Sequence, residues 1–231
     1  MPEDHLFALG DLRLELGGTL AGASLAYRTH GTLSPARDNA VLFPHMYSGT
    51  EASLDSWIGP GRALDSDRWL VVCPGQLGNR SSTSPSTTSG SFPDLTIGDD
   101  VVGQHRLVTE ELGIESVALV LGYSMGAQQA YEWAVRFPPA VERLAVFAGL
   151  ARTTPGNGLL VAASEEAIEA TKTLCRYIWD TYGRFPATVD PFLMTVWYQA
   201  AHLDVDFYDR YYPPDALPPH IRSHMRDWHG L

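Results

Sequence analysis

Apolar and β-branched residues along this chain fall into short segments separated by polar, glycine-rich stretches. Segments of this length with alternating or continuous apolar character are typical of β-strands. The last two segments, residues 117–121 and 144–147, are continuously apolar, which is typical of strands buried on both faces of a sheet. We therefore predict six strands, at residues 12–16, 24–30, 40–43, 69–73, 117–121 and 144–147.

Helical patterns separate the later strands. Between residues 101 and 112 the apolar positions share one helical face, with Asp99 or Asp100 as the expected cap and Gly113 as the expected end. Residues 127–135 form a second helix-like stretch. Strands that alternate with helices predict an α/β fold, with a mostly parallel sheet and helices on its faces.

The pattern changes after Gly149. Residues 151–158 read as a loop, and residues 164–182 as a helix that stops at Gly183. Residues 192–202 are a second helix or, on periodicity alone, a buried strand; prolines then interrupt the chain at positions 213, 214, 218 and 219. We expect an α/β core at 1–150 and a helical segment with a proline-rich tail at 151–231.

Composition excludes several classes of protein. The 231 residues are 45% hydrophobic and carry a formal net charge of -11, which argues against a nucleic-acid or anionic-membrane partner. Two cysteines are too few for a disulfide framework or a four-cysteine metal site, and we expect no bound metal. The chain has neither an 18-residue apolar run nor an apolar signal core at its start, so we expect a soluble, cytoplasmic protein.

One motif points to chemistry. Residues 122–126 read Gly-Tyr-Ser-Met-Gly and lie between the predicted strand 117–121 and a predicted helix. A strand, a tight turn and a helix are what a nucleophile elbow requires, because its serine sits on a strained bend that lifts the hydroxyl clear of the sheet. Ser124 is therefore the candidate nucleophile, and the Met125 N–H a candidate oxyanion donor at the helix N-terminus.

Several further segments carry a family resemblance. Together with 122–134 they resemble the homoserine O-acetyltransferase-like branch of the α/β-hydrolase superfamily, in order, over about residues 25–157; they are 30–33, 36–40, 58–65, 77–79, 92–97 and 104–113. The resemblance implies an α/β-hydrolase fold with a helical lid after the sixth strand, which places the lid in 151–231. It also implies acyl chemistry through a serine, with acyl-CoA as a possible co-substrate and no other cofactor.

The resemblance assigns roles to individual residues. Ser124 matches the nucleophile and Met125 the donor that follows it, while the loop after the third strand implies the Tyr47 backbone N–H as second donor. His45, in the same loop, is expected to shape the site rather than act as the base, and Arg152 is a candidate pocket cation. No later segment resembles the strands that carry the family's acid and histidine, so the fold is expected to be truncated after its sixth strand.

Three functions follow. The first is serine-dependent acyl transfer, in which Ser124 passes an acyl group from a small-molecule donor to a hydroxyl acceptor. The second is an esterase on the same elbow. The third is an inert, truncated member of the family, in which an exposed sheet edge favours a homodimer. The hydroxyl-rich stretch 78–90 lacks a phosphate-loop ending and is expected to be a flexible surface loop.

Overall fold

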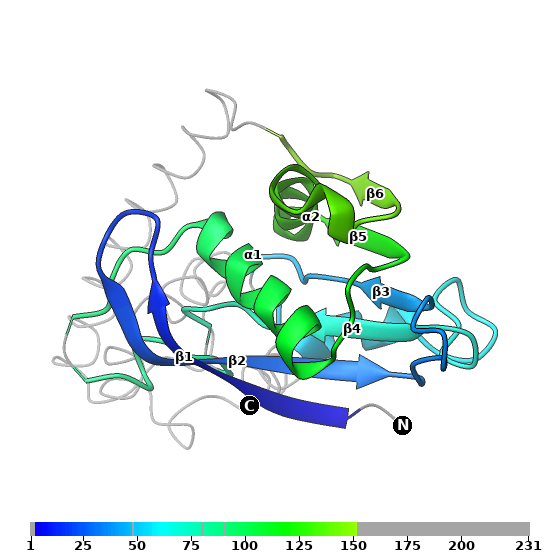
Figure 1. The fold of residues 1–231 in the computed structure, drawn as a ribbon, viewed down its shortest axis with the longest axis horizontal. Coiled ribbons are helices and arrows are strands. Elements are labelled where there is room, and N and C mark those ends of the chain that lie inside the picture. Colours follow the sequence, from blue (N-terminus) through cyan, green and yellow to red (C-terminus); the bar gives the residue numbers. More distant parts are fainter. Residues whose placement is uncertain (1–2, 48, 80, 90, 152–231) are drawn as a thin grey trace, which may run out of the picture. The chain divides into compact units, whose positions relative to one another are not determined.

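The computed structural model describes residues 3–47, 49–79, 81–89 and 91–151. Within them, six strands form one sheet in the order β1-β2-β4-β3-β5-β6 (Figure 1). The strands are β1 (Glu3–Arg13), β2 (Thr19–His30), β3 (Ala40–Leu42), β4 (Leu70–Pro74), β5 (Leu119–Tyr123) and β6 (Leu144–Phe147). The helical elements are η1 (Glu51–Trp57), α1 (Ile97–Arg106), η2 (Leu107–Glu111), α2 (Met125–Arg136) and η3 (Pro138–Ala140).

The sheet is parallel over its larger part. β3 pairs in parallel with β4 and β5, and β5 pairs in parallel with β6. β2 is antiparallel to β4, and β1 returns antiparallel beside β2. The prediction of an α/β fold with a mostly parallel sheet is confirmed.

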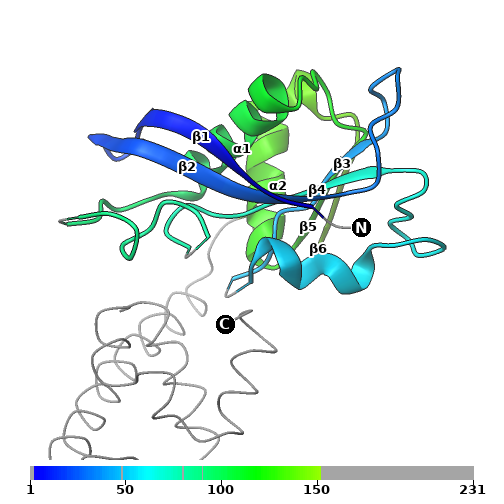
Figure 2. The same cartoon turned by 90° about the horizontal axis from the view of Figure 1, so that it is seen from below.

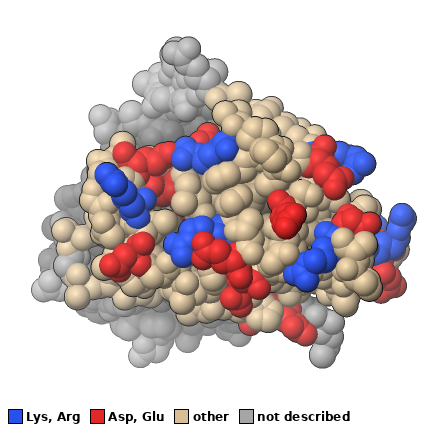
Figure 3. Space-filling model, viewed as in Figure 1, with Lys and Arg blue, Asp and Glu red and all other residues tan. Residues whose placement is uncertain are grey.

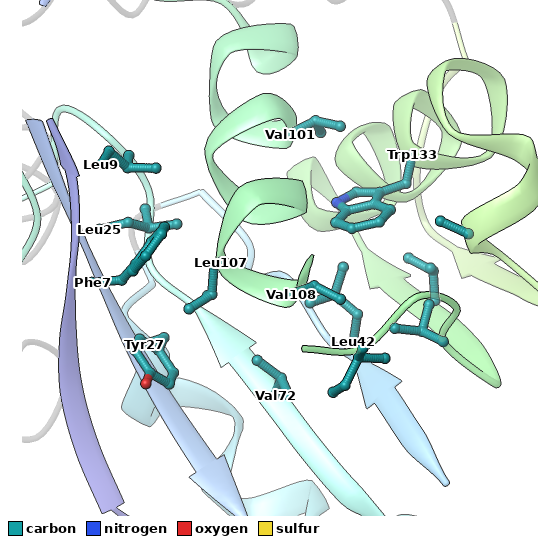
Figure 4. Close-up of a cluster of buried hydrophobic side chains, with 14 of the residues drawn as sticks. Phe7, Leu9, Leu25, Tyr27, Leu42, Val72, Val101, Leu107, Val108 and Trp133 are labelled. Atoms are coloured by element: carbon teal, nitrogen blue, oxygen red, sulfur yellow. The ribbon is translucent and has the colours of Figure 1, made fainter. Parts of the chain in front are cut away.

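Helices cover both faces of the sheet. α1 and α2 lie on one face and η1 lies on the other (Figure 2). Because neighbouring residues of a strand point to opposite faces, Leu42 packs into the core beneath α1 and α2 while Val41 packs beneath η1. Figure 4 shows the larger core, where Trp133 and Val101 from the two helices meet strand residues such as Leu42.

The start of α1 differs from the prediction. Thr96 is the N-cap, its side chain accepting the Asp99 amide while the Asp99 carboxylate accepts the Thr96 amide at 2.8 Å. This reciprocal capping box satisfies two amides at once. Asp100 is instead turned inward and accepts the Leu77 amide at 2.7 Å. The end of the helical segment at Gly113, where φ is +61°, agrees with the prediction.

The N-terminal strands also differ from their predicted positions. Most of the predicted strand 12–16 is the turn of a hairpin, closed by a hydrogen bond from the Leu14 amide to the Gly18 carbonyl at 3.2 Å. β1 begins much earlier, at Glu3, and two register shifts around Gly10 break the alternation of its buried residues. Such bulges hide the period of two from a sequence pattern.

β6 is less buried than its apolar sequence predicts. Leu144 is 39% exposed and Phe147 is 37% exposed. In the described part of the chain β6 pairs only with β5, so one of its edges is unpaired there. The prediction of burial on both faces is wrong for this strand.

The hydroxyl-rich stretch is a loop with several exposed residues, as expected, but its middle is held against β2. Ser82, Thr83 and Ser84 are buried. The Ser82 hydroxyl accepts the Ala26 amide at 3.0 Å, and the Thr83 hydroxyl accepts the Ser24 amide at 2.8 Å. These side chains take the place of a neighbouring strand beside part of β2.

Packing divides the chain into two units, Met1–Ala151 and Arg152–Leu231. The expected lid and proline-rich tail at 151–231 lie, apart from Ala151, outside the described residues. In the described unit, no helix is long and apolar enough to cross a membrane. Basic and acidic side chains are interspersed on the face drawn in Figure 3, rather than gathered by sign.

Candidate active site

Ser124 occupies the bend between the end of β5 and the start of α2. Its backbone has φ of 55° and ψ of -120°, a region that residues other than glycine rarely adopt. Holding a residue there costs on the order of 1–3 kcal/mol. The Ser124 amide donates to the Phe147 carbonyl at 3.2 Å, and the Ser124 carbonyl accepts the Ala127 amide at 3.0 Å. β6 and the first turn of α2 therefore fix the strained residue from both sides.

Glycine is required on both sides of Ser124. A Cβ on Gly122 would lie 2.6 Å from the Ala127 Cα, and a Cβ on Gly126 would overlap the Pro44 carbonyl oxygen. Both obstacles are backbone atoms, which cannot swing aside as a flexible side chain can. The bend therefore tolerates no side chain at either position. Gly149, which the sequence did not single out, is equally constrained because its Cβ would overlap that of Ala127.

The bend leaves the Ser124 side chain available. The residue is partly exposed, and its hydroxyl caps no amide of α2. Among the described residues, no acceptor takes a hydrogen bond from the Met125 amide. α2 has no acidic residue in its first turn, so the positive end of its dipole is unopposed there. The Ser124 hydroxyl and the free Met125 amide thus lie side by side, and the field of the helix N-terminus favours an anion there.

A second free amide lies in the β3 loop, by which we mean residues 44–47 and Gly49. Tyr47 ends the continuous described part of this loop, and its amide has no acceptor among the described residues. Gly126 packs against the carbonyls of Pro44 and His45, so the loop lies beside the N-terminus of α2. The structure therefore brings the loop that carries Tyr47 together with Ser124 and Met125.

His45 is enclosed within the protein. Its side chain has no exposed surface, and its Nδ1 lies 2.8 Å from the Met46 carbonyl oxygen. A carbonyl accepts, so Nδ1 carries the proton and Nε2 is an acceptor, one that has no partner in the described part of the chain. Burial lowers the pKa of His45 to about 4, so the ring is neutral at pH 7.

The other described histidines make contacts elsewhere. These are His5, His30 and His105, which contact Tyr27, Asp55 and Phe137 respectively. Arg152, the candidate pocket cation, lies outside the described residues, as do His202, His220, His224 and His229. Among the described residues, no group of three or more His, Cys, Asp or Glu is arranged to hold a metal ion.

An aromatic cluster beside Ser124 was not predicted from the sequence. Tyr123, which precedes Ser124, stacks on Phe147 with ring centroids 5.0 Å apart. The ring centroids of Trp57 and Phe147 are 5.8 Å apart. Trp57 is 47% exposed and Phe147 37%. The three residues are far apart in the sequence, and only the pairing of β5 with β6 and the position of η1 bring them together.

A family model described as the alpha/beta hydrolase fold matches residues 39–171. The chain belongs to the α/β-hydrolase family. The matched range includes β3 to β6, the β3 loop and the whole of the Ser124 elbow. The strained serine between β5 and α2 therefore lies within the segment that shows the family.

Relatives of two kinds are similar to this chain. It is 46% identical over 170 residues to an ethyl acetate hydrolase from Pseudomonas veronii, covering 71% of this chain and 49% of that protein. It is 38% identical over 180 residues to a homoserine O-acetyltransferase from Geobacter sulfurreducens, covering 68% and 49%. The chain thus spans about half the length of these relatives. The predicted likeness to homoserine O-acetyltransferases is confirmed.

Solved structures agree with this assignment. The fold matches an acetylester hydrolase from Corynebacterium glutamicum with a TM-score of 0.72 and 34% sequence identity, covering 90% of this chain and 61% of that chain. A homoserine O-acetyltransferase from Bacillus anthracis matches with a TM-score of 0.67 and 25% sequence identity, covering 92% of this chain and 64% of that chain. An esterase and an acyltransferase therefore each have a fold in common with this protein.

Proposed function

We propose that Ser124 is the nucleophile of a serine-dependent acyl-transfer reaction. The observation that carries the proposal is the backbone of Ser124, held at φ of 55° between β5 and α2 with its hydroxyl free of the helix. Strain of this kind at a polar residue is expected where a side chain must be presented to a substrate. The elbow glycines that enforce it support the same role.

The reaction begins when a general base takes the proton of the Ser124 hydroxyl and Oγ attacks the carbonyl carbon of an ester. The carbonyl oxygen becomes an oxyanion, which accepts hydrogen bonds from the Met125 and Tyr47 amides. Each such donor contributes about 3 kcal/mol to the stability of the transition state. The alcohol then leaves with the proton, and the acyl group remains on Ser124. We assign the base to a residue outside the described part of the chain, because the enclosed His45 has a pKa of about 4 and is a weak base, and the other described histidines contact residues elsewhere.

Two acceptors complete the reaction from the same acyl-enzyme. Water as acceptor gives an esterase, which the 46% identity to an ethyl acetate hydrolase supports. A hydroxyl compound as acceptor gives an acyltransferase, which the 38% identity to a homoserine O-acetyltransferase supports. The partly exposed aromatic cluster of Trp57, Tyr123 and Phe147 suits a small apolar group in either case.

Covalent labelling tests the nucleophile. The chain is treated with a fluorophosphonate probe, and the adduct is mapped by mass spectrometry. We expect stoichiometric labelling at Ser124, none in Ser124→Ala, and unchanged labelling in Ser56→Ala, which alters an exposed serine of η1. An unlabelled chain, or one labelled at another serine, would overturn the proposal and favour the inert alternative.

Product analysis then separates the two acceptors. The parent chain, without the probe, is incubated with p-nitrophenyl acetate, with and without L-homoserine. Acetate and O-acetylhomoserine are then measured. Acetate alone identifies water as the acceptor, whereas O-acetylhomoserine that increases with homoserine concentration identifies acyl transfer. Repeating the assay with acetyl-CoA as donor tests the proposed co-substrate.

A further inference from the structure

The β3 loop has its shape fixed by hydrogen bonds within itself. The Met46 carbonyl accepts the Gly49 amide at 3.1 Å and lies 2.8 Å from the His45 Nδ1. A Cβ on Gly49 would lie 2.7 Å from the Met46 sulfur, so the turn is tightly closed. These bonds set the turn, but none of them ties it to the rest of the molecule.

Two amide side chains from another loop supply that connection. Gln76 Nε2 donates to the His45 carbonyl at 2.9 Å, and Asn79 Nδ2 donates to the Gly49 carbonyl at 2.8 Å. Gln76 is buried and Asn79 is half-buried. The two anchored carbonyls stand on either side of Met46 and Tyr47, so the bonds bracket the amide that was assigned to the oxyanion.

The segment that carries these side chains is itself firmly held. The Gly75 amide donates to the Ala26 carbonyl at 2.7 Å, which ties the segment to β2. The Leu77 amide donates to the buried Asp100 carboxyl of α1 at 2.7 Å. The Gly78 amide closes a turn onto the Thr83 carbonyl at 2.8 Å. Gln76 and Asn79 therefore project from a rigid base.

We propose that Gln76 and Asn79 are positioning residues for the oxyanion site. They hold the β3 loop at a fixed distance from α2, so that the Tyr47 amide faces the same point as the Met125 amide. Two preorganised donors stabilise an oxyanion only if both stay aimed at it, and a displacement of about 1 Å costs on the order of 100-fold in rate. This inference deepens the proposed function and rests on it for the role of Tyr47.

Four substitutions test the inference. Gln76→Leu and Asn79→Ala each remove one anchor. Asn39→Ala is the matched control. The Asn39 Nδ2 also donates to two backbone carbonyls, those of Thr32 and Arg68, both at 3.0 Å, but neither carbonyl belongs to the β3 loop. Asn79→Asp adds a variant of the same shape that can no longer donate.

The first measurement is hydrogen exchange of the Gly49 amide, which donates to the Met46 carbonyl in the β3 loop, in the full chain. We expect exchange to become about tenfold faster in Gln76→Leu, Asn79→Ala and Asn79→Asp, and to stay unchanged in Asn39→Ala. Unchanged exchange in the anchor variants would overturn the proposal. This readout does not need catalysis, so it decides the anchoring even if the parent chain is unlabelled and the proposed function fails.

The second measurement is the rate of fluorophosphonate labelling at Ser124, resolved into a maximal rate constant and a half-saturating probe concentration. We expect the maximal rate constant to fall about 10- to 100-fold in the anchor variants with little change in half-saturation. A merely structural role would lower the melting temperature and leave the rate constant of the folded fraction intact. That result, or an equal loss in Asn39→Ala, would overturn the positioning role.

Discussion

A methyl group on Gly126 would overlap the carbonyl oxygen of Pro44, so the first turn of α2 lies directly against the β3 loop. The same methyl group would be 3.1 Å from the His45 carbonyl oxygen. The His45 oxygen is itself held in place by a hydrogen bond from the Gln76 side chain. The distance between the two candidate oxyanion donors therefore depends on the absence of a side chain at position 126.

Gly126→Ala should destabilise the protein although alanine is the better helix former. The added methyl group must displace the β3 loop, and overpacking of this kind costs about 1–3 kcal/mol. The free energy of unfolding, measured in urea, should fall by that amount, and labelling at Ser124 should be lost. Ala134→Gly, near the other end of α2, is the control for helix propensity and should cost about 1 kcal/mol. If Gly126→Ala were instead more stable than the parent, the contact with Pro44 would not be a constraint.

The strained backbone of Ser124 should lower the stability of the folded protein. At φ of 55° and ψ of -120° an alanine carries the same backbone strain as the serine, whereas glycine carries far less. We expect Ser124→Gly to be more stable than Ser124→Ala by about 1 kcal/mol in urea unfolding, with both variants unlabelled by the probe. Equal stability of the two variants would mean that the bend stores no strain.

The elbow could be predicted from the sequence because its causes are local. Gly122, Ser124 and Gly126 lie within five residues, and the strand before them and the helix after them are both visible as patterns. The steric conflict at Gly122 involves the first turn of the following helix, and only the conflict at Gly126, with the Pro44 and His45 carbonyls, involves a loop that is distant in the sequence. A short motif therefore specifies the conformation of the candidate nucleophile.

The elements around the elbow depend on partners that the local sequence does not reveal. Thr96, Asp99 and Asp100 are all acceptable helix caps by residue type. The Leu77 amide binds Asp100 and the Glu15 amide binds Asp99, while Thr96 is the cap. Gln76 and Asn79 carry no local signal, because their acceptors lie about thirty residues earlier in the chain. Predicting these contacts would require the order of the strands in the sheet.

The buried ring of His45 should make stability sensitive to mild acid. Its folded pKa is lowered from 6.5 to about 4, chiefly by burial, so between these values the unfolded chain binds a proton that the folded chain does not. The contribution of His45 to the free energy of unfolding should therefore fall as pH decreases from about 6.5 to 4. His45→Asn, which retains a donor for the Met46 carbonyl, should lack this component, a difference of about 1–3 kcal/mol in urea titrations. Parallel profiles of the two proteins from pH 7 to 4 would contradict the prediction.

Asp100 should act in the opposite direction, at higher pH. Burial, opposed by the Leu77 amide and reinforced by Asp99, raises its pKa from 3.8 to about 8. Between these values the folded chain keeps a proton that the unfolded chain has lost, so the contribution of Asp100 to the free energy of unfolding should fall as pH rises through this window. Asp100→Asn stays neutral and can still accept the Leu77 amide. It should gain on the parent by about 1–3 kcal/mol between pH 4 and 8.

Two measurements together decide whether the Asp100 carboxyl is the source of this effect. Urea unfolding of the parent and of Asp100→Asn at pH 5 and pH 8 gives the change in their difference, which should be positive in favour of the variant. A carbon-13 titration of the carboxyl group in the folded parent should have its midpoint near pH 8. A midpoint near 4, or a variant that loses ground to the parent as pH rises, would show that the folded protein holds Asp100 as an ion. The bond to the Leu77 amide, which anchors the base of Gln76 and Asn79, would then be charge-assisted and stronger in the parent than in the variant.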